Sequence, residues 1–193
     1  MKKLILASAS PRRKLLLEQI GLDFVIIPST VEEKIDETDP EKLVAELALL
    51  KASDVARSAE GLVIGADTIV VDGKTVLGKP RSKAEAIAML QQLSGRQHQV
   101  MTGVSVVDTE TEEHWVDVEI TRVYFRKLTL EEITWYVNSG EPMDKAGAYA
   151  IQEKGALFIQ GIEGDYFNIV GLPLLKTTQL LSRAGIQILQ YVQ

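Results

Sequence analysis

Short apolar runs and helical periodicities alternate along the first half of the chain. Apolar runs bounded by turn residues predict strands at 4–7, 24–27 and 62–71. Apolar residues at helical spacing predict helices at 11–21, about 40–57 and 82–93. Asp72-Gly73 predicts a hairpin whose return strand covers 75–77. Strands and helices that alternate in this way are typical of α/β proteins.

Strands cluster in the second half of the chain. Apolar and polar residues alternate over 99–107 and 114–125, which predicts two long strands joined by a polar turn. Thr129 and Glu132 form a capping box for a short helix that ends near Gly140. The remaining segments predict strands at 157–162, 166–170 and 186–192 and a helix at 172–183. The pattern therefore favours an α/β fold in which helices flank a mixed sheet, with 1–193 as a single domain.

Composition and charge exclude several classes of protein. The 193 residues include 21 lysines and arginines and 27 aspartates and glutamates, which gives a formal charge of −6. There is no cysteine, so the chain has no disulfide, thiolate nucleophile or thiolate zinc site. The acidic balance argues against nucleic acid as a partner. The two histidines, His98 and His114, follow no catalytic pattern and are expected to be structural or exposed.

No apolar run in the sequence has the length that a membrane requires. The run after Lys2-Lys3 is about four residues long, whereas the core of a signal peptide needs roughly 7–15. The other runs fall far short of the ~20 residues of a transmembrane helix. We therefore expect a cytoplasmic protein with no membrane partner.

The segment Ser8–Arg13 follows the first strand and opens the first helix. Ser10 is the predicted N-cap, and Pro11 suits the first helical position. Free N–H groups and the helix dipole favour an anion at such a turn, and Arg12 and Arg13 add guanidinium groups that match phosphate oxygens. The alternative is an ordinary capped helix with two solvated arginines.

Asp67 is an acid inside an almost entirely apolar strand. A carboxylate in such a place is costly unless it has a partner or a chemical role. Gly65 and Ala66, which precede it, are small enough to let a ligand approach the backbone. Asp67 is therefore the strongest candidate for a functional acid, and the alternatives are a solvent-exposed edge position or a structural ion pair.

Five further polar positions are weaker candidates, because each also has an ordinary structural interpretation. Glu32 and Glu33 point to opposite sides of an extended segment, so one of them could join the strand acid and a triphosphate in a Mg²⁺ site. Lys51 and Lys79 could neutralise phosphates, although each is compatible with an ordinary surface lysine. Gln152 ends a segment rich in small residues, and its amide could read a base edge, although a packed loop is the simpler interpretation.

Six blocks of the sequence together resemble the Maf family, and they occur in the family's order over nearly the whole chain. They are Ser8–Arg13, Gly65–Thr68, Leu77–Pro80, Ser94–Val104, Asp144–Gln152 and Val170–Pro173. The blocks are most similar to the branch that acts on dTTP and UTP. The resemblance implies a pyrophosphatase that cleaves between the α- and β-phosphates, with a divalent cation, Mg²⁺ or Mn²⁺, as cofactor. It also implies an elongated α/β fold similar to the ITPase-like (Maf/Ham) fold, with two lobes around a central cleft.

The resemblance also assigns roles to individual residues. It implies that Asp67 is the catalytic proton acceptor and, together with Glu33, a ligand of the cation; base and ligand are alternatives that the sequence leaves open. The positions linked to base preference are Arg13, Thr68 and Gln152. The positions linked to phosphate binding are Ser8, Arg12, Lys51 and Lys79.

Two other functions remain open at the level of the sequence. Maf proteins are also associated with inhibition of septum formation, so the chain could be a nucleotide-binding regulator of cell division with little turnover. It could also prefer modified pyrimidine triphosphates or other nucleotides. The resemblance is compatible with a homodimer, although no apolar stripe in the sequence demonstrates one.

Overall fold

A mixed sheet of seven strands organises the protein, a computed structural model of which describes residues 2–190. The strands are β1 Leu4–Leu6, β2 Val25–Ile26, β3 Leu62–Asp72, β4 Thr75–Leu77, β5 Gln97–Asp108, β6 His114–Phe125 and β7 Ile159–Glu163. Their order is β2-β1-β3-β5-β6-β7, with β4 paired to β3. β1 is parallel to β2 and β3, whereas β4 is antiparallel to β3 and β7 to β6. The expected mixed sheet is confirmed.

Helices and short 3₁₀ turns connect these strands. The α-helices are α1 Pro11–Gln19, α2 Pro40–Ala56, α3 Lys83–Leu93, α4 Leu130–Asn138, α5 Tyr166–Val170 and α6 Leu174–Arg183. The 3₁₀ turns are η1 Glu141–Asp144, η2 Ala146–Ala148, η3 Lys154–Phe158 and η4 Ile188–Gln190. Asp39, Ser82 and Thr129 accept hydrogen bonds from backbone N–H groups at the starts of α2, α3 and α4, and the capping box predicted at Thr129 and Glu132 is confirmed. Within the part of the chain that the structure describes, no helix is long and apolar enough to cross a membrane.

Two predictions of local structure are wrong. Residues 166–170 form α5 rather than a strand, because the Asp165 carboxylate accepts a hydrogen bond from Phe167 N (2.8 Å) and so starts a helical turn. A short apolar run cannot by itself distinguish strand from helix. The predicted last strand at 186–192 contains the 3₁₀ turn η4 instead, and its positions 191 and 192 lie outside the described residues.

The chain divides into two compact units that share three strands. Unit 1 comprises Met1–Asp67, Thr102–Glu119 and Gly171–Gln193, and unit 2 comprises Thr68–Met101 and Ile120–Val170. Each of β3, β5 and β6 contributes one part to each unit. The assignment of 1–193 to a single domain stays a prediction, and so does the central cleft.

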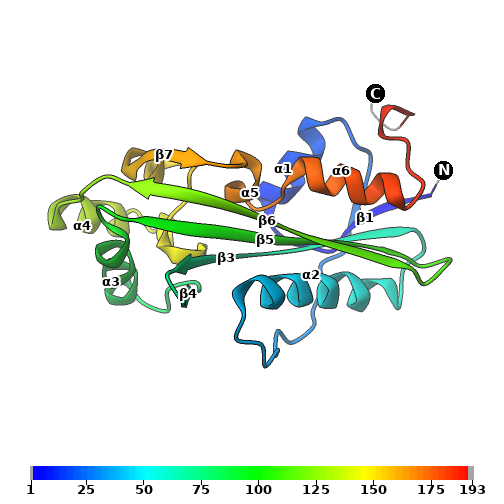
Figure 1. Ribbon diagram of the computed structural model, residues 1–193, viewed down its shortest axis with the longest axis horizontal. Helices are drawn as coiled ribbons and strands as arrows, with labels where there is room; N and C mark the ends of the chain where they lie inside the picture. Colours follow the sequence, from blue (N-terminus) through cyan, green and yellow to red (C-terminus); the bar gives the residue numbers. More distant parts are fainter. Residues whose placement is uncertain (1, 191–193) are drawn as a thin grey trace. The chain divides into compact units, whose positions relative to one another are not determined.

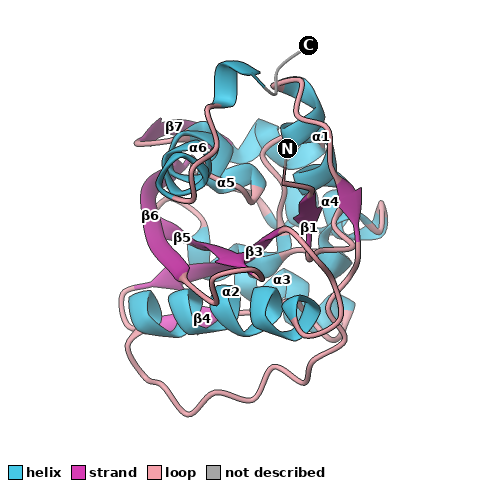
Figure 2. Ribbon diagram, turned by 90° about the vertical axis from the view of Figure 1, so that its right-hand side faces the viewer, coloured by secondary structure: helices cyan, strands magenta, loops and turns pink. Residues whose placement is uncertain are grey.

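Helices cover both faces of the sheet in unit 1. α2 lies on one face, while α1 and α6 lie on the other (Figure 1 and Figure 2). The close contact of α2 with β3 depends on glycine, because a Cβ atom at Gly65 would lie 2.3 Å from the carbonyl oxygen of Ala48. Gly65 therefore makes room for a helix, and the expectation that it makes room for a ligand is wrong.

The register between β1 and β3 sets the position of the first loop of unit 1. Leu6 pairs with Ile64, and Ala7 N donates a hydrogen bond to the Ile64 carbonyl oxygen (2.8 Å). β1 ends at this point, whereas β3 continues. Because parallel strands run in step, the turn at Ser8 leaves the sheet beside the stretch of β3 that carries Asp67.

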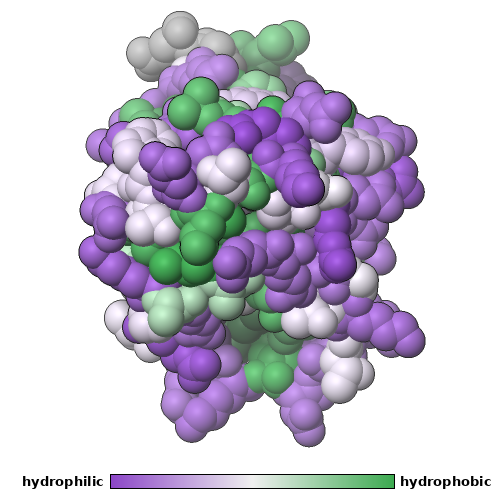
Figure 3. All heavy atoms as spheres, turned by 90° about the vertical axis from the view of Figure 1, so that its left-hand side faces the viewer, coloured by the Kyte–Doolittle hydropathy of each residue, from purple (hydrophilic) through white to green (hydrophobic). Residues whose placement is uncertain are grey.

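Unit 2 has an apolar core of its own, in which aromatic rings meet edge to face. The ring centroids of Tyr136 on α4 and Phe158 on η3 are 4.9 Å apart, and both side chains are almost fully buried. Apolar side chains also reach the surface of this unit, among them Trp135 and Leu157, which are 51% and 61% exposed. Figure 3 shows apolar patches bordered by hydrophilic side chains on one face of the molecule. The homodimer stays a prediction.

His98 is a buried core residue of unit 2. Its Nε2 atom lies 2.8 Å from the Tyr149 hydroxyl, and its ring meets Phe125 and Tyr149 edge to face. Burial lowers the pKa of His98 to about 4, partly opposed by the negative charge of Asp72. His114 is exposed at the start of β6. The prediction that the two histidines are structural or exposed is confirmed.

We expect the stability of the protein to fall on acidification because of His98. Its pKa in the folded state lies below the ~6.5 of an unfolded chain, so the stability it contributes is complete above about pH 6.5 and is lost as the pH falls toward about 4. This loss amounts to about 2 kcal/mol between about pH 7.5 and about pH 5. Urea titrations should show a smaller loss for His98→Gln and an unchanged loss for His114→Gln. Equal losses in all three proteins would contradict the assignment.

Candidate active site

The turn after β1 holds a half-buried arginine in a fixed position. Nε of Arg13 donates to the Gly171 carbonyl oxygen (2.7 Å), and Nη1 donates to Ser8 Oγ (3.1 Å). Ser8 Oγ also accepts a hydrogen bond from Ser10 N (3.2 Å). Ser10 occupies the N-cap position of α1, as predicted, but its side chain makes no capping bond. Arg13 thus links two of the six Maf-like sequence blocks, Ser8–Arg13 and Val170–Pro173.

The charge of Arg13 is coupled to acids of the same unit. Burial lowers the pKa of Arg13, the negative charges of Asp67 and Glu33 act to raise it, and the positive charge of Arg12 acts to lower it. Charges influence one another in this way only over short distances. The alternative of two solvated arginines therefore does not hold for Arg13.

Asp67 is buried and ion-paired. Its Oδ1 lies 2.5 Å from Nζ of Lys51, which α2 supplies from the neighbouring layer. Glu33 reaches the same nitrogen through Oε1, at 2.9 Å. The side chains of Asp67 and Lys51 are 12% and 14% exposed, whereas Glu33 is 52% exposed. The ammonium group compensates the burial of the Asp67 charge, and two acids from separate segments converge on one point.

A second acid of α2 ties down the loop that carries Glu33. Asp54, one helical turn after Lys51, accepts hydrogen bonds from Ser29 Oγ (2.7 Å) and Thr30 N (3.1 Å). The bond from Ser29 is the first cause of the lowered pKa of Asp54. The sequence analysis missed Asp54, although its spacing from Lys51 places both on one side of the helix.

The prediction for the two adjacent acids of this loop is confirmed. Glu33 contacts Lys51, whereas Glu32 pairs with Lys34 (2.6 Å). Adjacent residues of an extended segment point in opposite directions, so only one of the two can reach α2.

Three of the predicted site residues belong to unit 2. Thr68 opens the part of β3 that lies in this unit. Lys79 is exposed in the segment after β4, where the carbonyl oxygen of Gly78 accepts a hydrogen bond from Gly147 N (3.1 Å). Gln152 is exposed in the turn before η3. Unit 1 therefore brings together Ser8 with Arg13, and Glu33 with Lys51 and Asp67. Arg12 also lies in unit 1, where its charge acts on Arg13, while Thr68, Lys79 and Gln152 lie on separate segments of unit 2.

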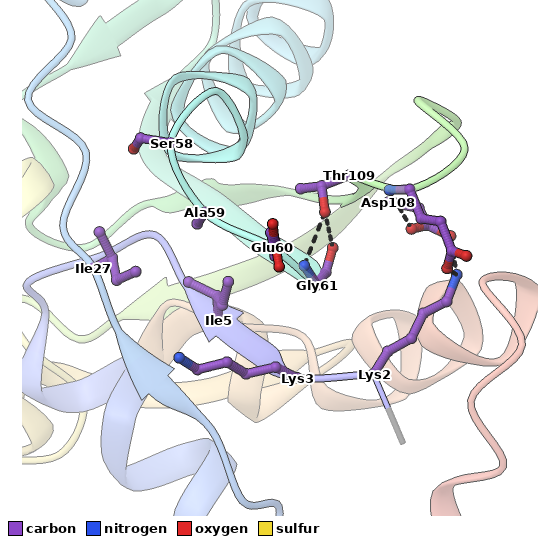
Figure 4. A pocket seen from close by; sticks show the side chains of 11 residues that line it. Lys2, Lys3, Ile5, Ile27, Ser58, Ala59, Glu60, Gly61, Asp108 and Thr109 are labelled. Carbon is purple, nitrogen blue, oxygen red and sulfur yellow. Dashed lines mark hydrogen bonds and ion pairs between the residues drawn. The ribbon is translucent and has the colours of Figure 1, made fainter.

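A cavity of about 820 Å³ lies at the amino ends of β1 and β3, within unit 1. Lys3, Ile5 and Glu60 are among its lining residues, and Figure 4 shows Lys2 reaching toward Asp108 beside it. Asp67 is not among the lining residues. β3 runs from this cavity toward Asp67, so the cavity and the Asp67–Lys51 ion pair lie at opposite ends of the parallel strands.

Comparison with known proteins places the chain in a family. The model of the Maf family, described as Maf-like protein, matches residues 3–184. The chain belongs to the Maf family. The resemblance seen in the six sequence blocks is therefore confirmed over nearly the whole chain.

Several relatives of this Maf protein carry the name dTTP/UTP pyrophosphatase. The relative from Alkaliphilus oremlandii is 52% identical over 179 residues, covering 91% of this chain and 93% of the relative. The relative from Geobacillus sp. is 52% identical over 187 residues, covering 96% and 100%. The relative from Acetivibrio thermocellus is 47% identical over 201 residues and covers both chains completely.

Solved structures of Ham1 proteins share the fold of this Maf protein. The HAM1 protein from Coxiella burnetii superimposes with a TM-score of 0.56 at 16% identity and covers 95% of this chain and 100% of its own. The Ham1 protein from Staphylococcus aureus gives a TM-score of 0.55 at 18% identity and covers 94% and 100%. The expected ITPase-like (Maf/Ham) fold is confirmed, and the likeness at this identity concerns the fold alone.

Proposed function

We propose that this protein is a nucleoside triphosphate pyrophosphatase that hydrolyses dTTP and UTP to the monophosphate and pyrophosphate. Relatives that are 47–52% identical over most of the chain carry this function in their names. The observation that carries the proposal is the buried carboxylate of Asp67, which shares the Lys51 ammonium group with Glu33 and lies in the same unit as the Ser8–Arg13 turn. A carboxylate that can accept a proton and cations that can neutralise phosphate charge both favour hydrolysis of a phosphoanhydride.

In the proposed reaction a water molecule attacks the α-phosphorus. A new P–O bond forms to the water oxygen, the bond from the α-phosphorus to the α,β-bridging oxygen breaks, and pyrophosphate leaves with the electron pair. Asp67 accepts the proton of the water, because a carboxylate close to the attacking oxygen is a general base. Arg12, Arg13 and Lys51 stabilise the charge that develops on the phosphate oxygens, and Ser8 orients Arg13.

The donor set of unit 1 fits a divalent cation. Lys51 Nζ lies within 2.5 Å of Asp67 Oδ1 and 2.9 Å of Glu33 Oε1, so the two carboxylates already converge on a positive charge. Carboxylate oxygens are ligands that Mg²⁺ and Mn²⁺ accept. The described residues hold no group of three or more such side chains, so phosphate oxygens and water would complete the coordination. When bound, the cation would neutralise phosphate charge.

Base selection is proposed to depend on unit 2 and on Arg13. Gln152 offers one amide donor and one carbonyl acceptor, which is the chemistry that a pyrimidine edge presents in return. A site built to hydrogen-bond one base penalises another base, because buried polar groups are then left without partners. Thr68 could contribute a hydroxyl, and Lys79 could add positive charge near the phosphates.

Replacement of Gln152 by alanine should blur the preference for the base more than it lowers the rate on the preferred substrate. We expect the ratio of kcat/KM for dTTP over dCTP to fall about tenfold or more, because one matched hydrogen-bonding group is removed. Kinetics with each nucleotide at saturating Mg²⁺ measure this ratio. The exposed Gln160 of β7 provides the matched control, and Gln160→Ala should leave the ratio unchanged. An unchanged ranking of nucleotides in Gln152→Ala would remove Gln152 from base selection.

One assay tests the proposed function against both alternatives. Release of pyrophosphate is measured with canonical and modified nucleoside triphosphates in the presence of Mg²⁺ or Mn²⁺. Preferential turnover of dTTP and UTP is the expected result. Preferential turnover of a modified pyrimidine triphosphate would change the substrate but keep the reaction. Nucleotide binding without pyrophosphate release would favour the regulator of septum formation instead.

A further inference from the structure

The segment that carries Gln152 is held on its amino-terminal side by a buried tyrosine of unit 2. Ala150 N donates a hydrogen bond to Tyr136 Oη (3.3 Å). Tyr136 Oη in turn donates to Glu141 Oε1 (2.8 Å). The tyrosine hydroxyl is thus both an acceptor for the segment and a donor to the acid.

The same acid holds the carboxyl-terminal side of the segment. Glu141 Oε1 accepts a hydrogen bond from Gly155 N (3.1 Å), and Oε2 accepts one from Lys154 N (3.2 Å). A carboxylate that accepts from backbone N–H groups makes stronger bonds than a neutral oxygen would. Tyr136 and Glu141, together called the Tyr136–Glu141 brace here, therefore close the segment 150–155 from both sides.

The two sides of the segment approach closely at the brace. A Cβ atom at Gly155 would lie 2.5 Å from the Ala150 carbonyl oxygen and 2.9 Å from Tyr136 Oη, so the position requires glycine. Gly155 is also buried. The base of the segment is consequently close-packed, because no larger side chain fits at this position.

Tyr136 of the brace is buried and Glu141 is half-buried, whereas the tip of the segment is exposed. Tyr136 is 0% exposed and packs against Phe158, while Gln152 is exposed. Burial and the hydrogen bond to Glu141 raise the pKa of Tyr136, so its hydroxyl keeps the proton that it donates. The segment therefore presents an exposed amide on a close-packed base, which limits the entropy that the amide loses when it binds.

We propose that Tyr136 and Glu141 are positioning residues for base selection, which hold the segment 150–155 so that the Gln152 amide meets the base in one orientation. The inference rests on the proposed function, because it concerns the selectivity of that reaction. A hydrogen-bonding group discriminates between bases only if its supporting residues keep it within a fraction of an ångström of its place. Neither residue contacts the reacting phosphates in this account, so turnover of the preferred nucleotide should depend on them little.

Tyr136→Phe tests the inference, because it removes the hydroxyl and keeps the ring. We expect the ratio of kcat/KM for dTTP over dCTP to fall about fivefold or more, while kcat for dTTP changes less than about twofold. The matched control is Tyr124→Phe in the same unit, which removes a hydroxyl that donates to Glu163 Oε2 (3.0 Å). Its ratio should equal that of the unchanged protein.

Glu141 provides a second variant should Tyr136→Phe fail to fold. Glu141→Gln keeps one oxygen that can accept from the segment, so it should retain more selectivity than Glu141→Ala. The inference is overturned if these variants keep the original ratio while Gln152→Ala loses it. It is also overturned if they lower kcat for dTTP and dCTP equally, which is the signature of a purely structural role. If the unchanged protein releases no pyrophosphate from any nucleotide, the proposed function itself has failed.

Discussion

Replacement of Asp67 by asparagine should abolish pyrophosphate release from dTTP while the fold and nucleotide binding persist. The amide has the shape of the carboxyl group but cannot take a proton from water, and loss of a general base costs up to about 10⁴-fold in rate. The Lys51 ammonium still has Glu33 at 2.9 Å, so the variant leaves little uncompensated charge in the protein. Single-turnover rates, nucleotide affinity and the melting temperature measure the three expectations separately.

The same variant separates the two roles that Asp67 could have. If Asp67 is mainly a ligand of the cation, a higher Mg²⁺ concentration should restore a large part of the rate. If it is the base, saturating Mg²⁺ should leave the rate low, because the proton acceptor is still missing. Asp72→Asn is the control, because Asp72 lies on the same strand and bonds to Gln92 (2.7 Å). Near-normal pyrophosphate release by Asp67→Asn would remove Asp67 from the mechanism.

Replacement of Lys51 by methionine should affect both stability and activity. It removes the ammonium group that the buried Asp67 carboxylate shares with Glu33, so we expect a loss of about 3 kcal/mol in the free energy of unfolding in the absence of divalent cations. We also expect pyrophosphate release to fall about 100-fold, because a charge that stabilises the phosphates is gone. Urea titrations and initial rates measure the two effects.

Divalent cations should act differently on this variant and on the unchanged protein. Mg²⁺ or Mn²⁺ should stabilise Lys51→Met more, because two carboxylates without an ammonium group offer a stronger cation site. Lys51→Arg should keep most of the stability, since the charge remains. Lys176→Met is the matched control, because Lys176 pairs with Asp117 (2.7 Å) in the same unit. Equal stabilisation by Mg²⁺ in Lys51→Met and Lys176→Met would argue against a cation site between Asp67 and Glu33.

Most of the local structure followed from short-range chemistry. The capping box at Thr129, the hairpin at Asp72-Gly73 and the long strands expected at 99–107 and 114–125 were predictable, because each depends on neighbours in the chain. The strand predicted at 166–170 failed because a short, mostly apolar run fits a helix equally well, and the Asp165 hydrogen bond favoured the helix. The outcome there depends on one contact that the apolar pattern does not contain.

Part of the candidate site could likewise be predicted from the sequence, and part of it could not. Asp67 is conspicuous from the sequence alone as an acid in an apolar strand, since burial of a charge has a high energetic cost. Its partners could not be found in this way, because Lys51 and Glu33 lie on a helix and a loop whose approach to β3 depends on packing. The role of Gly65 could not be predicted from the sequence either. Only the position of α2 shows that a glycine is needed there to make room for Ala48.

Residue types and their order along the chain were thus enough to predict the family, the class of fold and Asp67 as the candidate functional acid. They were not enough for the ion pairs around Asp67, the anchoring of Arg13 by Ser8 and Gly171, or the Tyr136–Glu141 brace. Each of these contacts joins segments that are distant in sequence, and its geometry is set by how whole helices and strands pack. The sequence shows that a charge lies in an apolar strand and therefore needs compensation. Only the tertiary structure determines which side chain provides it.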